Sequence, residues 1–434
     1  MKNYKKVYAA FILAGGLILH GCNGIFDDLA INPNQPSMGA YFTSPSAVND
    51  AVMTMYGYMS TQRCLGASGS KTTIIRSDEA SSNSDYGKPG MFGADLNASY
   101  YTIEQPYTLM YTTASQASYI IETAPSVDFS GNEEMRNAYM GEAYFWRAFA
   151  HYYLLINFRN ISPIRQMPRN GDDYVRPLEK PAAVWDFIEE HLAHAKGLLP
   201  VKGYWDSKNA GRVTKASAAA LLGKAYLYRS GIEQYYGEDK TTFYSEAAKE
   251  FGDVIDGKYG TYDLTKNYAD NFDVAHENNE ESILEFQFLG DVDNAGFNPG
   301  LATSGLAFDS RGLMLPGAGV GYEGVVHNWL YNAFVNSVDK DGYTDIRMFS
   351  TMIFNDLDAS IHLRNDAGGN PVRLEGPGGY KWEELYPAKN GKEGFATVSN
   401  PLAHSFKAGI RKGIDCSMPT QTEADGTPKL VGVG

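Results

Sequence analysis

The chain has 434 residues, of which 43% are hydrophobic and 20% charged, and its formal net charge is −14. This composition is typical of a globular protein with one large or two medium domains. The acidic balance argues against nucleic acid as a partner, because phosphate binding needs a basic face. Aromatic residues make up 13% of the chain, with 30 tyrosines. They indicate either aromatic packing in the core or platforms for a flat or sugar-like ligand.

The N-terminus has the pattern of a secretory signal. Three lysines precede the apolar run Val7–Leu19, which leads into His20-Gly21-Cys22. A basic start, a short apolar stretch and a small residue before the cleavage point are typical of such signals, and the run is too short to span a bilayer comfortably. Leu19-His20-Gly21-Cys22 resembles the bacterial lipobox. We therefore expect a signal peptide at residues 1–21 and a lipidated Cys22, with plain secretion and an incidental cysteine as the alternative.

Residues 22–44 are rich in Pro, Asn and Ser and are expected to tether the body of the protein to the lipid. Two further cysteines follow, Cys64 and Cys416. A disulfide between them is compatible with an oxidising compartment, and two free thiols are the alternative. The sequence contains no CxxC motif and no Cys/His cluster, so a structural zinc site is not expected.

The periodic segments that follow predict a mainly helical chain. One helix starts at Ser44-Pro45-Ser46, and an irregular polar segment occupies residues 61–106. Apolar spacing then predicts helices at Tyr107–Thr123, Glu133–Phe158, Pro181–Pro200, Lys215–Arg229 and Phe243–Ile255. From about residue 260 Gly, Asn, Asp and Pro multiply, with one more helix at Val325–Val335 and a short extended run at Ile283–Phe288. We expect a helical lobe at residues 45–260 and a loop-rich lobe at residues 261–434.

The stretch Met140–Phe158 is apolar on nearly every side and is interrupted only by Glu142, Arg147 and His151. A helix of this kind must be covered by other helices or by lipid, and its three ionisable residues argue against a membrane span. It is therefore expected to be the central helix of a bundle. Trp146 on this helix and Trp185 on the next are assigned to packing.

A weak internal repeat runs through the helices. Leu222-Gly223-x-x-Tyr226 and Ala247-x-x-x-Phe251 have the spacing of the two helices of a tetratricopeptide pair, and Met140-Gly141-x-x-Tyr144 repeats the first half. Small residues at these positions let two helices cross closely. Ordinary helix hairpins are the alternative interpretation.

Motifs for catalysis or metal binding are weak. Gly319–Gly324 fits GxGxxG but lacks the strand and the βαβ context of a dinucleotide site, so a flexible turn is expected. Asp339, Asp341 and Asp345 surround Gly342 with hard oxygens suited to calcium, but a solvated acidic turn is the preferred interpretation. No pattern indicates a catalytic centre, a cofactor or a metal site.

Binding is the remaining chemistry, since aromatic rings stack on sugar faces and polar side chains suit sugar hydroxyls. The irregular segment and the second lobe both offer such residues. The candidates are Arg76, Asp78, Tyr86, Asn97 and Tyr101 in the first region, and Tyr322, Trp329 and Trp382 in the second. For each aromatic residue, local packing is the alternative.

Four segments of the chain carry recognisable motifs. The first is the helix Gly141-Glu142-Ala143-Tyr144-Phe145-Trp146-Arg147-Ala148. The others are Val184–Leu192, Gly211-Arg212-Val213-Thr214-Lys215 leading into Ala220–Tyr228, and Asn278 with Glu281–Phe288. Together they resemble the SusD/RagB family of surface glycan-binding lipoproteins, in which the first motif reads Gly-Glu-Ala-x-Phe-Leu-Arg-Ala. The resemblance implies a mostly α fold, a tetratricopeptide-like bundle with a loop-rich second lobe. It also implies a non-catalytic outer-membrane lipoprotein that hands oligosaccharides to a TonB-dependent transporter.

The sequence departs from the family at its end. Members usually continue into an Arg-Tyr-Ala-Asp…Tyr-Ala-Glu-Ala helix that closes the bundle, whereas this sequence reaches Gly434 without it. Either a truncated member or an incomplete record is implied, and the central helix is then expected to lack part of its cover. Two further hypotheses stay open: a lipoprotein scaffold whose repeats bind only protein, and an enzyme acting on glycans.

Overall fold

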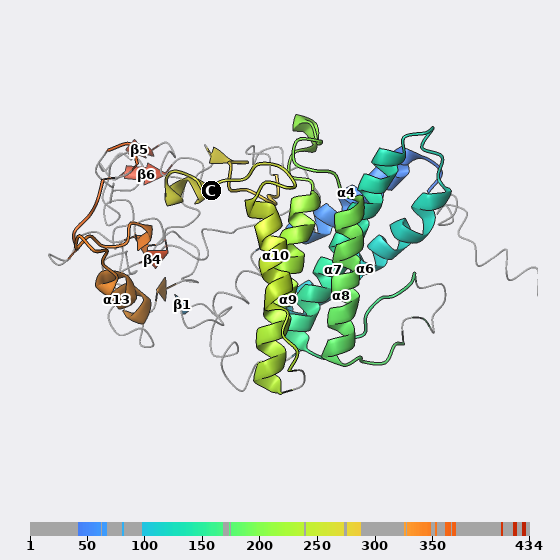
Figure 1. Cartoon of the computed structure of the whole chain (residues 1–434), viewed down its shortest axis with the longest axis horizontal. Coiled ribbons are helices and arrows are strands. Elements are labelled where there is room, and N and C mark those ends of the chain that lie inside the picture. The colour runs from blue at the N-terminus through green and yellow to red at the C-terminus, as the bar shows by residue number, and fades with distance from the viewer. Residues whose placement is uncertain are drawn as a thin grey trace, which may run out of the picture.

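The computed structural model describes residues 42–61, 63–66, 98–167, 173, 175–237, 240–272, 276–287, 328–348, 361–365 and 367–369, together with a set of short strands. Figure 1 shows a helical lobe and, beside it, a second lobe that contains the labelled strands and helix α13. The expected signal peptide, Cys22 and most of the expected tether lie outside the described residues. Phe42, near the end of that tether, is 6% exposed and belongs to the core.

The helices of the first lobe follow one another closely in space. They are α4 (Pro45–Ser60), α6 (Tyr101–Thr123), α7 (Glu133–Phe158), α8 (Pro181–Leu198), α9 (Lys215–Tyr236) and α10 (Tyr244–Ile255). Short 3₁₀ turns lie at Ala124–Ser126, Ser207–Asn209 and Tyr268–Phe272. Each helix packs mainly against the next one in the chain, and α7 also contacts α4 and α9. This sequential packing confirms the predicted mostly α, tetratricopeptide-like bundle.

Local signals explain where these helices begin and end. The Asn132 side chain accepts a hydrogen bond from the Met135 amide at 3.1 Å, and two glutamates in the first turn favour the positive end of α7. Pro181 occupies the first turn of α8, where its missing N–H is tolerated. Helix α9 ends at Gly237, whose φ of 71° is the left-handed conformation of a helix C-cap.

Helix α7 lies at the centre of the core. Trp146 and Trp185 are both 0% exposed, which confirms their assignment to packing. The three ionisable interruptions of α7 are buried as well, and none of its large apolar side chains is exposed. The expectation that the central helix lacks part of its cover is therefore wrong, because α4, α6, α8 and α9 enclose it.

Two glycines permit the close approaches that the repeat spacing predicted. A Cβ atom on Gly223 of α9 would lie 2.9 Å from the Phe251 ring of α10. A Cβ atom on Gly141 of α7 would lie 2.9 Å from Leu199, which directly follows α8. Side chains at either position would push the paired elements apart.

Three predicted boundaries are wrong. Helix α6 begins at Tyr101 rather than Tyr107, because the buried stripe of Thr102, Pro106 and Met110 continues through the proline. Helix α9 extends to Tyr236, since its buried face continues through Ser230 and Glu233. The expected helix at Val325–Val335 is a strand at Val325–Val326 followed by a helix, and residues 283–287 form no strand.

The second lobe contains two small sheets and helix α13 (Asn328–Asn336). The first sheet has the antiparallel order β1-β2-β4-β3. Its strands are β1 (Ala80–Ser81), β2 (Val325–Val326), β4 (Gly409–Ile410) and β3 (Met352–Ile353). Strands β5 (Thr420–Thr422) and β6 (Pro428–Leu430) pair antiparallel in the second sheet. Segments far apart in the sequence therefore meet in the first sheet.

Candidate functional site

The pairing of β1 with β2 brings together the two regions that carry the predicted binding residues. Ala80 pairs with Val326 and Ser81 with Val325. Because the strands are antiparallel, the start of β1 lies beside the end of β2. Asp78 precedes β1 by two residues in the sequence, and Trp329 follows β2 by three. The irregular segment and the second lobe thus meet at the end of the sheet from which α13 departs.

Trp329 is the candidate that the structure describes most fully. It lies near the start of α13, and 47% of the residue is exposed. An exposed indole is the kind of platform on which a sugar ring stacks. Tyr101 is the first residue of α6 and is therefore on a helix rather than in the irregular segment. The other candidates, Arg76, Asp78, Tyr86, Asn97, Tyr322 and Trp382, lie outside the described residues, as does the GxGxxG turn.

The segment 281–287, which falls within the predicted second lobe, docks on the helical core. The Phe286 ring stacks on Trp146 with centroids 5.8 Å apart, and Ser217 donates a hydrogen bond to the Ile283 carbonyl at 3.0 Å. Gly211 has a φ of +80°, and a Cβ atom there would lie 2.4 Å from the Glu285 carbonyl oxygen. The family-like motif around Gly211 therefore forms a tight junction with this segment.

A buried ion pair joins two of the family-like motifs. The Arg212 guanidinium donates to both Glu142 oxygens, at 2.9 and 2.5 Å, across 70 positions of sequence. The Tyr56 hydroxyl donates to Glu142 at 2.7 Å and accepts from the Val213 amide at 2.8 Å. Burial raises the pKa of the Glu142 carboxyl, while the hydrogen bonds from Arg212 and Tyr56 oppose that rise. Sequence reasoning treated Glu142 only as an interruption, although its place in one motif and that of Arg212 in another were available signals.

The other two interruptions of α7 belong to a second buried cluster. The Nδ1 atoms of His151 and His191 lie 2.7 and 2.6 Å from the carbonyls of Arg147 and Phe187. Each Nε2 atom then serves as an acceptor, from the Ile164 amide at 2.9 Å for His151 and from the Arg147 guanidinium for His191. Burial lowers the pKa of both histidines to about 3. Both rings are consequently neutral, and the cluster holds α7, α8 and the connection after α7 together.

The acidic turn around Gly342 has its carboxylates paired with arginines. Arg364 donates to Asp339 at 2.8 Å and to Asp341 at 2.5 Å, and Arg347 donates to Asp345. Within the described part of the chain no three His, Cys, Asp or Glu side chains are grouped to hold a metal ion. Cys64 is a free, fully buried thiol, and burial raises its pKa to about 12. Cys416 lies outside the described residues.

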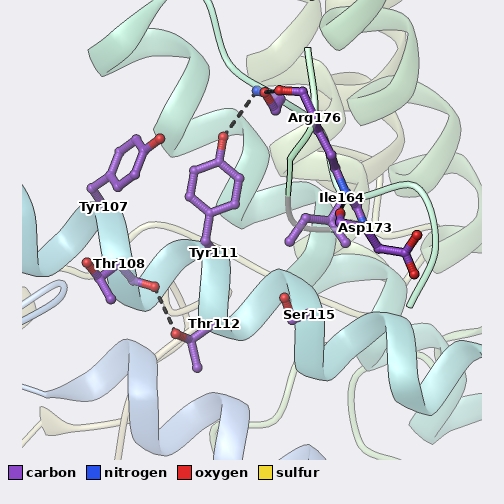
Figure 2. A pocket seen from close by; sticks show the side chains of 9 residues that line it. Tyr107, Thr108, Tyr111, Thr112, Ser115, Ile164, Asp173 and Arg176 are labelled. Atoms are coloured by element: carbon purple, nitrogen blue, oxygen red, sulfur yellow. Dashed lines mark hydrogen bonds between the residues drawn. The ribbon is translucent and has the colours of Figure 1, made fainter. Parts of the chain in front are cut away.

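A pocket of about 420 Å³ opens between α6 and the connection from α7 to α8 (Figure 2). It is lined by Tyr107, Thr108, Tyr111, Thr112, Ser115, Ser162, Ile164, Asp173 and Arg176. Figure 2 shows Tyr107 and Tyr111 side by side on α6, with Tyr111 nearer to Ile164 and Arg176. The Tyr111 hydroxyl accepts a hydrogen bond from the Ser162 amide at 3.2 Å, and burial raises its pKa above the ordinary value.

Sequence reasoning did not find this pocket, although a signal was present. The five lining residues of α6 fall at positions 107, 108, 111, 112 and 115, which is the spacing of one helical face. That face is formed by tyrosines and hydroxyl side chains, whereas a surface face is more often charged. The helices of the described residues include none that is long and apolar enough to cross a membrane.

Comparison with known proteins agrees with this architecture. A family model, SusD-like_3, described as "Starch-binding associating with outer membrane", matches residues 30–227. A SusD-like protein of Bacteroides ovatus is 25% identical over 67% of this chain and 51% of its own length. The chain thus spans about half the length of this curated relative.

Solved structures give the same fold at lower identity. A SusD superfamily protein of Bacteroides vulgatus has a TM-score of 0.62 at 19% identity, over 86% of this chain and 68% of its own. A laminarin-binding SusD-like protein has a TM-score of 0.57 at 20% identity, over 85% of this chain and 77% of its own. The fold defines a tetratricopeptide-like helical protein with a loop-rich second lobe. Over residues 30–227 the chain matches the SusD-like family model, and the curated relatives that it matches are SusD-like proteins.

Proposed function

We propose that this chain binds glycans at the outer membrane and delivers them to a TonB-dependent transporter. The observation that carries the proposal is the β1–β2 pairing, because β1 directly follows a polar stretch of sequence and the exposed Trp329 lies three residues after β2. The family description names starch binding and the outer membrane, and a structural relative binds laminarin. Both support a polysaccharide-derived ligand.

The proposed site combines an indole platform with polar side chains. Trp329 offers a half-exposed ring for stacking, and Arg76 and Asp78 stand in the sequence just before the strand that pairs with β2. Tyr86, Asn97, Tyr322 and Trp382 complete the proposed set, whereas Tyr101 begins α6 in the helical lobe and is left out of it. Sugar rings need both kinds of group, since their faces are apolar and their edges carry hydroxyls.

Affinity electrophoresis of the full chain in gels containing starch, laminarin or xyloglucan tests the proposal. Retardation by at least one glycan is expected, and Trp329→Ala should weaken it by about two- to tenfold, because a stacked aromatic ring contributes roughly 0.5–1.5 kcal/mol. Tyr235→Ala is the matched control, since Tyr235 lies on α9 in the other lobe and is 84% exposed. Retardation by no glycan, from a folded chain, would overturn the proposal.

We propose no catalytic step for this chain. The same glycans should therefore be recovered unchanged after prolonged incubation. If the chain releases shorter products, and if substitution of one carboxylate residue abolishes that release, the protein is an enzyme acting on glycans rather than a binding protein.

Lipid attachment at Cys22 is part of the proposal. Several acyl chains hold a soluble body firmly on a bilayer, since each buried CH₂ contributes about 0.8 kcal/mol. Cys22→Ala should therefore release the protein from the membrane fraction, and retention of this variant there would argue against a lipid anchor.

One observation favours a protein-binding scaffold as a second candidate. Leu227, Tyr228 and Tyr235 are exposed at helical spacing on one face of α9. Exposed apolar faces of this kind mark protein interaction sites. A pull-down that retains the transporter while every glycan fails to bind would favour this candidate, and Tyr235→Ala should then weaken the pull-down.

A further inference from the structure

The pocket on α6 has the mixed surface that a sugar ring requires. Its apolar part is formed by Tyr107, Tyr111 and Ile164, and its polar part by the hydroxyls of α6 and by Arg176. Tyr107 is 39% exposed at the rim, with its ring 4.9 Å from those of Tyr111 and Phe158. These contacts hold the ring in place, so that little side-chain freedom would be lost on stacking.

Hydrogen-bonding groups in the pocket are available to a ligand. Over the part of the chain that the structure describes, the hydroxyls of Thr108 and Ser115 make no hydrogen bond. Arg176 donates through Nε to the Asp173 carbonyl and through one terminal nitrogen to the Gln166 carbonyl at 3.2 Å. A guanidinium has five N–H groups, so others remain to donate to a ligand. Two backbone carbonyls thus fix a cation at the edge of the pocket.

The rear of the pocket is rigid. The Ser162 hydroxyl donates to the carbonyls of Arg176 and Pro177, at 3.1 and 2.9 Å. The Ile164 amide donates to the buried, neutral His151 ring. Ser162 and Ile164 are therefore fastened to residues 176–177 and to α7, and these contacts hold the rear wall of the pocket in place before a ligand arrives.

The volume of the α6 pocket and the charges of its lining residues indicate which ligands it fits. A volume of about 420 Å³ lies toward the lower end of the range for small-ligand sites, roughly 300–1,000 Å³. Such a volume suits a short unit rather than a long chain. Side chains of both charge signs, Arg176 and Asp173, line the pocket. A carboxylated or sulfated sugar would meet Asp173 as well as Arg176, so a neutral sugar suits the pocket better.

We propose that this pocket is a second carbohydrate site, which takes one end of a neutral oligosaccharide and is separate from the site at Trp329. The inference rests on the proposed glycan-binding function. Figure 1 shows α6 in the helical lobe and β1 with α13 in the other. Two sites in different lobes would let one chain hold two glycans, or two points of one polymer, and so raise the avidity for a polysaccharide.

Isothermal titration of the full chain with laminarihexaose and a xylogluco-oligosaccharide tests the inference. Ser115→Leu places a larger, helix-favouring side chain in the pocket and should reduce the number of ligands bound per chain by about one. When Ser115→Leu is combined with Trp329→Ala, it should weaken oligosaccharide binding at the α6 pocket by ~10-fold or more. Ser245→Leu, an exposed position of α10, is the matched control and should leave both quantities unchanged.

Hydrogen exchange with the same oligosaccharides locates the site without any substitution. Protection of α6 amides near Tyr107–Ser115 is expected in the wild type and in Trp329→Ala, and it should be absent in Ser115→Leu. Thermal melting of each variant shows whether it remains folded. If Ser115→Leu unfolds, the second site is tested by Trp329→Ala alone, in which the oligosaccharide should still protect the α6 amides near Tyr107–Ser115.

The outcomes separate the two proposals. Loss of all binding in Trp329→Ala, with wild-type binding intact, would overturn the second site and leave the proposed function standing. Binding of trigalacturonate in the pocket in preference to the neutral probes would overturn the neutral class. A wild-type chain that binds none of these probes and none of the polysaccharide gels would overturn both.

Discussion

Two arginine–carboxylate clusters of this protein share their chemistry but differ in burial. In the helical lobe, the side chains of Arg212 and Glu142 are 3% and 0% exposed and connect two helical motifs. In the second lobe, Arg364 joins Asp339 and Asp341 with side chains that are 39–49% exposed. Water already solvates the second cluster, whereas the first has only protein partners. The same ion pair is therefore expected to be essential in one lobe and nearly neutral in the other.

Arg212→Met tests the buried side of this comparison and should have the largest effect. It leaves the Glu142 carboxylate in the core with the Tyr56 hydroxyl as its remaining partner, which should lower the free energy of unfolding by ~3–5 kcal/mol. Urea denaturation followed by tryptophan fluorescence measures the change. A loss below ~1 kcal/mol would contradict the importance assigned to this pair.

The neutral histidines of the same lobe predict a dependence on pH. Their pKa values are about 3 in the folded chain, below the ordinary value of 6.5, so the unfolded chain binds more protons between these limits. The contribution of the two histidines to the free energy of unfolding is therefore fully present above about pH 6.5. It falls by about 1.4 kcal/mol per pH unit for each histidine as the pH is lowered toward 3. Denaturation curves at pH 5, 6 and 7 measure this slope.

The two buried histidines contribute equally to the change of unfolding free energy with pH. His151→Gln should remove the contribution of one of them, because the neutral amide does not titrate. His194→Gln is the control, since the His194 side chain is 55% exposed. An equal slope in wild type and His151→Gln would show that protonation of the buried cluster does not limit acid stability.

The junction between the lobes is tested by a pair of glycines. Gly211→Ala combines a positive φ with a contact on the Glu285 carbonyl, whereas Gly131→Ala has a similar φ of +82° and nothing within 4 Å. The control should lose ~1 kcal/mol from backbone strain alone, and Gly211→Ala a further ~1–3 kcal/mol from the contact. Equal losses in thermal melts would mean that segment 281–287 moves aside readily.

Arg364→Met should have the smallest effect. Exposed ion pairs contribute about 0–1 kcal/mol, and salt screens them. Urea denaturation should therefore give nearly the wild-type free energy of unfolding. A loss as large as that of Arg212→Met would show that the Gly342 turn is a structural centre of the second lobe.

Much of the helical lobe could be predicted because its signals are local. Helix α7 spans Glu133–Phe158 as predicted, since its cap, its acidic first turn and its apolar run all lie within the segment. The repeat spacing predicted that Gly223 and Phe251 lie on the two helices of one pair, and the two positions are in contact. The errors also have local causes. The start predicted at Tyr107 left Pro106 outside the helix, whereas the buried stripe of α6 continues through it. Val325-Val326 continued a helical period, although the two residues lie in a sheet.

The candidate binding region could be predicted only in part. Sequence composition selected the irregular segment and the second lobe separately, and nothing in either pattern indicated that the two meet. Their contact depends on two-residue strands whose partners lie more than two hundred positions apart, Ala80 with Val326 and Ser81 with Val325. Strands this short have no periodicity of their own, and only the assembled sheet defines them.

The sequence by itself determined the class of this protein: a helical repeat lobe, a loop-rich second lobe and a family with characteristic helix motifs. Helix periodicity and capping act over a few residues and are therefore visible in the chain. The tertiary structure alone decided the Glu142–Arg212 pair, the neutral histidine cluster and the α6 pocket. Each depends on side chains that approach only after folding, and the removal of water around them gives their charges and hydroxyls the properties argued above.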